Sequence, residues 1–70
     1  MKPGDLIMLC SESPRTVYTY SAEDIEWEPG RMGIFLGGRD AGLGMLEVLY
    51  DGRMGWLDED TCVSVVDDPA

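Results

Sequence analysis

The chain has 70 residues, of which 14 are aspartate or glutamate and 5 are lysine or arginine, so its formal net charge at pH 7 is −9. This length predicts one small domain, residues 1–70, with a modest core. The negative charge argues against direct binding to nucleic acid, whose phosphates attract clustered lysine and arginine. The absence of histidine removes the commonest general base and metal ligand.

Membrane and export signals are also missing from the sequence pattern. No apolar run approaches the ~20 residues that span a membrane. The first residues show no charged stretch leading into an apolar signal segment. We therefore expect no membrane partner and a cytoplasmic location.

The first predicted strand covers residues 6–10, after a turn at Pro3-Gly4-Asp5. A polar segment, residues 11–30, follows and is expected to form a long acidic and aromatic loop between the first two strands. Loops of this length are unusual in compact domains and often carry function. A second strand is predicted over residues 31–36, followed by a flexible glycine-rich hairpin tip over residues 37–44.

The C-terminal third predicts a hairpin and a final strand. Residues 45–50 alternate around Glu47, which should face water, and Asp51-Gly52 favours a type I′ turn. Residues 53–57 form the returning strand, and 58–61 a polar turn. The last strand covers 62–66, and a flexible tail covers 67–70.

Five short strands with a long first loop predict an all-β fold, a small closed antiparallel barrel that leaves no exposed edges. The sequence resembles Src-homology-3-like barrels in its opening strand (residues 4–8), its long loop (11–30) and its ending (55–63). The positions that carry the peptide-binding signature of that family differ, since the groove proline corresponds to Asp58. The resemblance therefore implies the barrel without polyproline binding.

A second resemblance concerns style. The arrangement Ser-Pro-Arg-x-Val followed by Pro-Gly-Arg-x-Gly-Ile is similar to small barrel proteins of marine tailed phages. It implies a small phage accessory or virion protein, located in the host cytoplasm or in the virion.

The predicted core consists of the apolar residues that alternate along these strands. Its members are Leu6 or Ile7, Leu9, Ile34, Leu36, Leu46, Val48, Tyr50, Leu57, Val63 and Val65. Since the family ending turns Leu57 inward, Trp56 should point outward. With Tyr18, Tyr20 and Trp27 it would form an aromatic floor for a cationic peptide, through cation–π contacts of about 0.5–2 kcal/mol each. The alternative is that Trp27 and the tyrosines pack down to seal the end of the barrel.

Two acidic groups accompany these aromatic residues. The first contains Glu23, Asp24, Glu26 and Glu28, and the second contains Asp58, Glu59 and Asp60. Together they would make a negative face for a basic protein partner, or would imitate nucleic-acid phosphates. The alternative is a solvated surface that keeps the domain soluble. Their spacing does not match a calcium loop, and we expect neither a metal nor another cofactor.

The cysteines give a geometric prediction. If the first and last strands pair antiparallel with Leu6 opposite Val66, Cys10 lies opposite Cys62, about 4.5–5.5 Å away. We expect neighbouring thiols that are reduced in a cytosol. The apolar pattern turns both cysteines outward, whereas the family ending implies that Cys62 points inward, and the sequence leaves both options open.

No enzyme signature is present, since no serine or cysteine has a histidine to activate it and the glycine-rich segment lacks the ending of a phosphate loop. We predict a non-catalytic protein-interaction module that docks on a basic or amphipathic protein. One alternative is an acidic inhibitor that mimics nucleic acid and blocks a DNA- or RNA-binding protein of the host. Another is a homo-oligomer, a self-associating decoration subunit that uses methionine contacts: Met8, Met32, Met45 or Met54.

Overall fold

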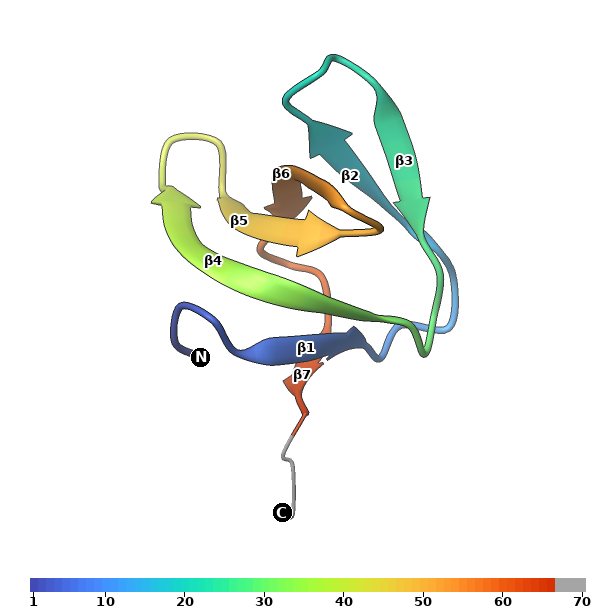
Figure 1. The fold of residues 1–70 in the computed structure, drawn as a ribbon. Helices are drawn as coiled ribbons and strands as arrows, with labels where there is room; N and C mark the ends of the chain where they lie inside the picture. Colours follow the sequence, from blue (N-terminus) through green and yellow to red (C-terminus); the bar gives the residue numbers. More distant parts are fainter. Residues whose placement is uncertain (67–70) are drawn as a thin grey trace.

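The structure, a computed structural model, describes residues 1–66 as one antiparallel sheet of seven strands (Figure 1). The strands are β1 (Leu6–Leu9), β2 (Arg15–Thr19), β3 (Asp24–Trp27), β4 (Met32–Asp40), β5 (Met45–Tyr50), β6 (Arg53–Asp58) and β7 (Val63–Val65). Their order across the sheet is β3-β2-β6-β5-β4-β1-β7. The predicted tail, residues 67–70, lies outside the described residues.

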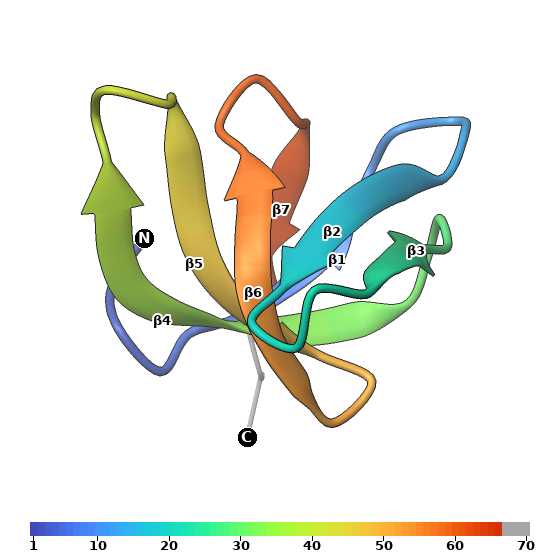
Figure 2. The same ribbon diagram turned by 90° about the horizontal axis from the view of Figure 1, so that it is seen from above.

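The sheet is strongly curled but open, so the all-β prediction is confirmed while the closed five-stranded barrel is wrong. Figure 2 shows the strong curvature of the sheet, whose two edge strands are β3 and β7. Two extra strands account for the difference, because β2 and β3 lie within the segment 11–30 that was expected to be a loop. β2 pairs with β6 and so lengthens the sheet at the strand that would otherwise be an edge.

The β2–β3 hairpin forms because its residues alternate between the two faces. Val17 pairs with Ile25 across the hairpin and with Leu57 of β6, and all three point to the core. Arg15 pairs with Trp27, two residues further along each strand of the hairpin and therefore on the same face. The turn between the strands uses a positive φ of 63° at Ala22. A two-residue period is therefore present in this polar segment, carried by few apolar residues.

The hairpin predicted at Asp51-Gly52 is confirmed. Both residues have positive φ, 53° and 75°, and Tyr50 pairs directly with Arg53. These are the dihedral signs that a type I′ turn requires.

Strand β4 is longer than predicted and sharply bent. Its pairing with β5 shifts register between Phe35 and Arg39, at Gly37, whose φ is 97°. A side chain at Gly38 would lie 2.8 Å from a carboxylate oxygen of Glu47, so the bend also needs a small residue there. The first half of the glycine-rich segment is thus the end of a strand, and the prediction of a hairpin tip over residues 37–44 holds only for its second half.

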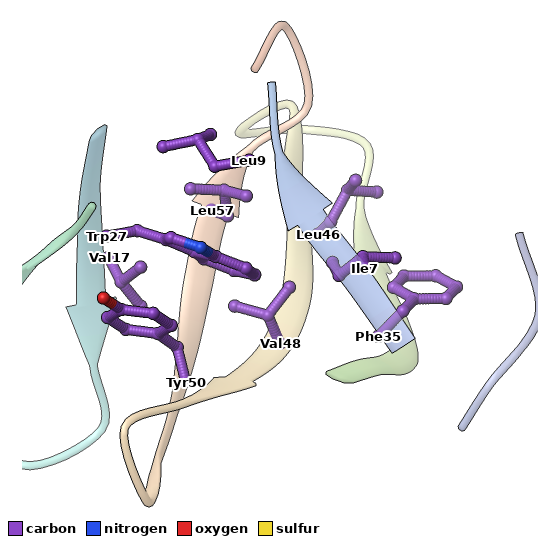
Figure 3. Close-up of a cluster of buried hydrophobic side chains, with 9 residues drawn as sticks. All are labelled: Ile7, Leu9, Val17, Trp27, Phe35, Leu46, Val48, Tyr50 and Leu57. Carbon is purple, nitrogen blue, oxygen red and sulfur yellow. The ribbon is translucent and has the colours of Figure 1, made fainter. Parts of the chain in front are cut away.

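The core lies on the inner, concave side of the sheet (Figure 3). Its buried members are Ile7, Leu9, Val17, Trp27, Phe35, Leu46, Val48, Tyr50 and Leu57. Phe35 points to the core from β4, where Ile34 and Leu36 were predicted to do so. The reason is that Gly33 pairs with the inward-pointing Ile7, so residues 33 and 35 lie on the inner face of β4 and residues 34 and 36 on its outer face. The exposed fraction of Val65 is 46%, so the prediction that it belongs to the core is also wrong.

The prediction that Cys10 lies opposite Cys62 is confirmed, whereas the prediction that both are free thiols is wrong. Leu9 pairs with Val63, which sets Cys10 opposite Cys62 with their Cα atoms 5.5 Å apart. The two residues form a disulfide rather than free thiols. Both are exposed, so the outward orientation predicted from the apolar pattern holds.

Candidate functional site

A row of four side chains crosses the outer face of the sheet, the face opposite the core. Strand register places Tyr18 of β2 opposite Asp24 of β3 on one side and opposite Trp56 of β6 on the other. Trp56 in turn lies opposite Glu47 of β5. We call these residues the outer-face row. Their chain neighbours Val17 and Leu57 point into the core, so the row necessarily points away from it.

Tyr20 adds a third aromatic ring beside this row. Its backbone N–H donates to the carbonyl of Met54 at 3.2 Å, which holds the end of β2 against β6. Its ring meets that of Trp56 edge-to-face, with centroids 6.1 Å apart and an angle of 71° between the planes. This is a favourable arrangement for two aromatic quadrupoles.

The hydroxyl of Tyr20 donates a hydrogen bond to Glu47. This bond, with smaller contributions from desolvation and the nearby charge, raises the pKa of Tyr20 from 10.0 to about 12. Tyr20 therefore keeps its phenolic proton at physiological pH and donates it in the hydrogen bond to the carboxylate of Glu47. The contact ties the aromatic ring and the acidic end of the outer-face row into one unit.

Three of the four predicted aromatic site residues are brought together. Tyr18 and Tyr20 have exposed fractions of 43% and 52%, and Trp56 is half-buried. Trp27 is a correction, because it is completely buried and stacks on Tyr50 with centroids 4.6 Å apart. Its indole N–H donates to the carbonyl of Arg31 at 2.9 Å. The alternative prediction, that Trp27 and the tyrosines pack down against the barrel, therefore holds for Trp27 but not for Tyr18 and Tyr20, which stay exposed.

The first acidic group lies around the aromatic residues. Asp24 and Glu26 are exposed on the outer face of β3, and Glu23 forms an ion pair with Arg53 at the neighbouring turn. Glu28 follows β3, and its backbone N–H donates to the hydroxyl of Tyr50 at 3.1 Å. A negative rim thus borders one end of the aromatic cluster.

The second acidic group divides between two places. Asp58 is half-buried on the outer face at the end of β6 and lines, with Tyr18, a shallow hollow of about 280 Å³. Glu59 and Asp60 are exposed in the turn that follows, which leads to β7 rather than to the aromatic cluster. Only Asp58 of this group therefore belongs with the predicted surface.

Sequence reasoning missed Glu47 as a site residue. Its position between apolar residues correctly indicated an outward-facing charge, but its neighbours depend on the pairing of β5 with β6 and of β6 with β2. Those pairings join residues far apart in the chain. A correct register for all three strands was the signal needed.

The described part of the chain offers no group of three or more metal-binding side chains. Likewise, no helix within residues 1–66 is long and apolar enough to cross a membrane. What the outer-face row offers chemically is a set of aromatic faces with carboxylates at both ends. Such a set suits a cation, and above all a planar guanidinium.

Comparison of the chain with protein-family models, with curated proteins and with solved structures gave no match. A small, curled, all-β antiparallel sheet is the part of the predicted resemblance that the fold supports. The function must therefore be argued from the surface itself.

Proposed function

We propose that the protein is a non-catalytic interaction module whose outer-face row, together with Tyr20, binds a basic segment of a partner protein. The observation that carries the proposal is the register of four strands, which sets Asp24, Tyr18, Trp56 and Glu47 side by side in one row. Aromatic faces lie in the middle of this row and carboxylates lie at both ends. An arginine-bearing strand or loop fits this pattern in both shape and charge.

The energetics favour a charge-selective contact of moderate strength. A guanidinium that stacks on Trp56 or Tyr18 gains about 0.5–2 kcal/mol per contact. A carboxylate at either end of the row accepts hydrogen bonds from the same group. The net charge of −9 raises the encounter rate with a basic surface, most strongly at low ionic strength.

The experiment is a binding titration with the peptide Arg-Gly-Arg-Gly-Arg and with a control in which citrulline replaces every arginine. Citrulline keeps the planar shape and removes the charge. We expect saturable binding of the arginine peptide only, weakened at least tenfold by Trp56→Ala or Asp24→Asn. The matched control Glu12→Gln, an exposed residue in the β1–β2 connection, should leave binding unchanged. Equal binding of both peptides would refute the proposal.

Salt separates this function from imitation of nucleic acid. Aromatic stacking persists at ~0.5 M salt, whereas exposed charge–charge attraction is largely screened. Binding that vanishes completely at that concentration would favour the acidic mimic instead.

The proposal extends to the setting of the protein, a small accessory or virion component of a phage that acts in the host cytoplasm. The support is the resemblance of two short sequence motifs to those of small barrel proteins of marine tailed phages. The disulfide between Cys10 and Cys62 counts against the cytoplasmic part of this proposal, because such bonds persist mainly in oxidising compartments. Thiol labelling of freshly lysed cells tests it, since a cytoplasmic protein should label at both cysteines.

Self-association is a second candidate, favoured by a continuous apolar row on the same outer face. Register places Leu6 opposite Ile34, Ile34 opposite Leu49, and Leu49 opposite Met54. Leu6 and Met54 have exposed fractions of 43% and 52%. A concentration-dependent oligomer in sedimentation velocity that Met54→Lys abolishes would support this role, and a monomer at all concentrations would exclude it.

A further inference from the structure

The free edge of β7 has an unusual composition for an exposed strand edge. Exposed edges are normally protected by charged side chains that discourage pairing with other chains. The opposite edge, β3, carries Asp24 and Glu26 and follows this rule. β7 and the residue after it read Val-Ser-Val-Val and carry no charge.

The backbone groups of this edge point outward in a known pattern. Cys10 donates to the carbonyl of Cys62, and Val66 donates to the carbonyl of Leu6, so residues 62, 64 and 66 face β1. By alternation, the N–H and C=O groups of Val63 and Val65 face away from β1. Within residues 1–66 these groups have no hydrogen-bond partner. They form a two-residue template for another strand.

A hollow of about 510 Å³ adjoins the start of β7. It is lined by Leu46 of β5, Arg39 of β4, Val63, and the turn residues Glu59, Asp60 and Thr61. Thr61 is buried, and its hydroxyl has no hydrogen-bond partner in the described part of the chain. An unpaired buried hydroxyl is costly and gains by meeting a polar group. The lining of the hollow therefore combines apolar side chains, two carboxylates and the side chain of Arg39, and the unpaired hydroxyl of Thr61 is buried beside them.

The disulfide holds this template in place. β7 has only three residues, and a strand that short would otherwise separate easily from β1 (Figure 1). The bond between Cys10 and Cys62 fixes the residue immediately before β7 to the end of β1. The edge is consequently preorganised, which lowers the entropic cost of adding a strand.

We infer that β7 binds an extended segment of a partner protein by strand addition, with valine-like residues at its centre and a lysine or arginine at the end that meets the turn before β7. The charge requirement follows from Glu59 and Asp60, which are exposed in that turn and line the hollow. In this mode the main-chain hydrogen bonds supply affinity and alternate side chains supply specificity. Side chains opposite Val63 and Val65 point to the inner face of the sheet, and the next such side chain, opposite Thr61, reaches the hollow.

A second copy of this chain fits less well. Each copy would carry a net charge of −9, so two copies repel one another as they approach. The site is also separate from the outer-face row, so either proposal can fail without the other.

The test uses the acetylated and amidated peptide Lys-Thr-Val-Thr-Val-Thr-Lys with the intact oxidised protein. Its two valines are placed opposite Val65 and Val63, and its last lysine opposite Thr61. We expect saturable binding that protects the amide protons of Val63 and Val65 from hydrogen exchange. N-methylation of both valines should weaken binding at least tenfold, whereas N-methylation of the first two threonines, whose N–H groups point away from β7, should change it less than threefold. The peptide with glutamate in place of its last lysine, the one placed opposite Thr61, should bind at least threefold more weakly.

Matched protein variants complete the experiment. Val65→Pro removes an N–H that faces the free edge without removing a bond to β1, and proline is tolerated on edge strands. It should abolish binding, whereas Glu26→Pro on the opposite edge should not, with circular dichroism confirming that both variants fold. Equal binding of the two N-methylated peptides, or no protection at Val63 and Val65, would overturn the inference. Protection that depends on protein concentration without peptide would assign the edge to a second copy.

Discussion

Replacement of both cysteines with serine should cost the protein a large part of its stability. The disulfide joins residues separated by 52 positions, so it closes a loop of most of the chain. Loop-closure entropy for that length predicts a loss of about 4 kcal/mol at 25 °C. A domain of this size typically has about 4–10 kcal/mol in total. Cys10 and Cys62 are both exposed, so the substitution leaves no core cavity, and the loss should come from the unfolded chain.

The assay is urea unfolding of the oxidised protein, the reduced protein and the Cys10→Ser/Cys62→Ser variant. The reduced protein and the variant should agree, and both should show a steeper dependence on urea, because an unlinked chain exposes more surface when it unfolds. The single variant Cys10→Ser should behave like the double variant, and a reducing agent should not affect the double variant. If the oxidised protein and the double variant differ by less than about 1 kcal/mol, the reasoning from chain entropy is refuted.

Three further predictions follow from the packing and the electrostatics. Trp27→Ala should destabilise the protein by about 3–5 kcal/mol, enough to unfold much of it, whereas Trp56→Ala should cost about 1 kcal/mol. Melting curves that give both variants the same loss of stability would contradict the assignment of the two tryptophans to opposite faces. Gly33→Ala should cost about 1–3 kcal/mol in urea unfolding, because a methyl group there would lie 2.5 Å from the indole of Trp27, while Gly42→Ala, where the nearest atom is 3.4 Å away, should be neutral. Because the pKa of Tyr20 is raised from 10.0 to about 12, its stabilising hydrogen bond should persist below pH 10 and be lost as the pH rises towards 12. Titration of tyrosinate absorbance should show a component at high pH that Tyr20→Phe removes.

Local sequence signals predicted those parts of the fold that depend on local geometry. The Asp51-Gly52 turn needs positive φ at both residues, and the dipeptide alone indicates it. The opposition of Cys10 and Cys62 followed from one assumed register between two strands. The outward orientation of Trp56 followed from the inward orientation of Leu57.

The remaining features depend on pairings that join distant residues. β2 and β3 were taken for a loop because their inner faces carry few apolar residues, and their stability comes from the contact of β2 with β6. Phe35 was placed on the wrong face because the inner face of β4 begins at Gly33, which pairs with Ile7 and lies beneath the indole of Trp27. A glycine adds nothing to the hydrophobic pattern, so the sequence did not indicate which residues of β4 point inward. Glu47 became a site residue only through its pairing with Trp56.

The two tryptophans provide the most direct test of the proposed interaction surface. Trp56 lies in the outer-face row, whereas Trp27 is buried and its indole N–H is bonded to the carbonyl of Arg31. In a nuclear magnetic resonance titration with Arg-Gly-Arg-Gly-Arg, the indole N–H signal of Trp56 should shift saturably and that of Trp27 should stay in place. Shifts of equal size at both indoles, or at neither, would contradict the account.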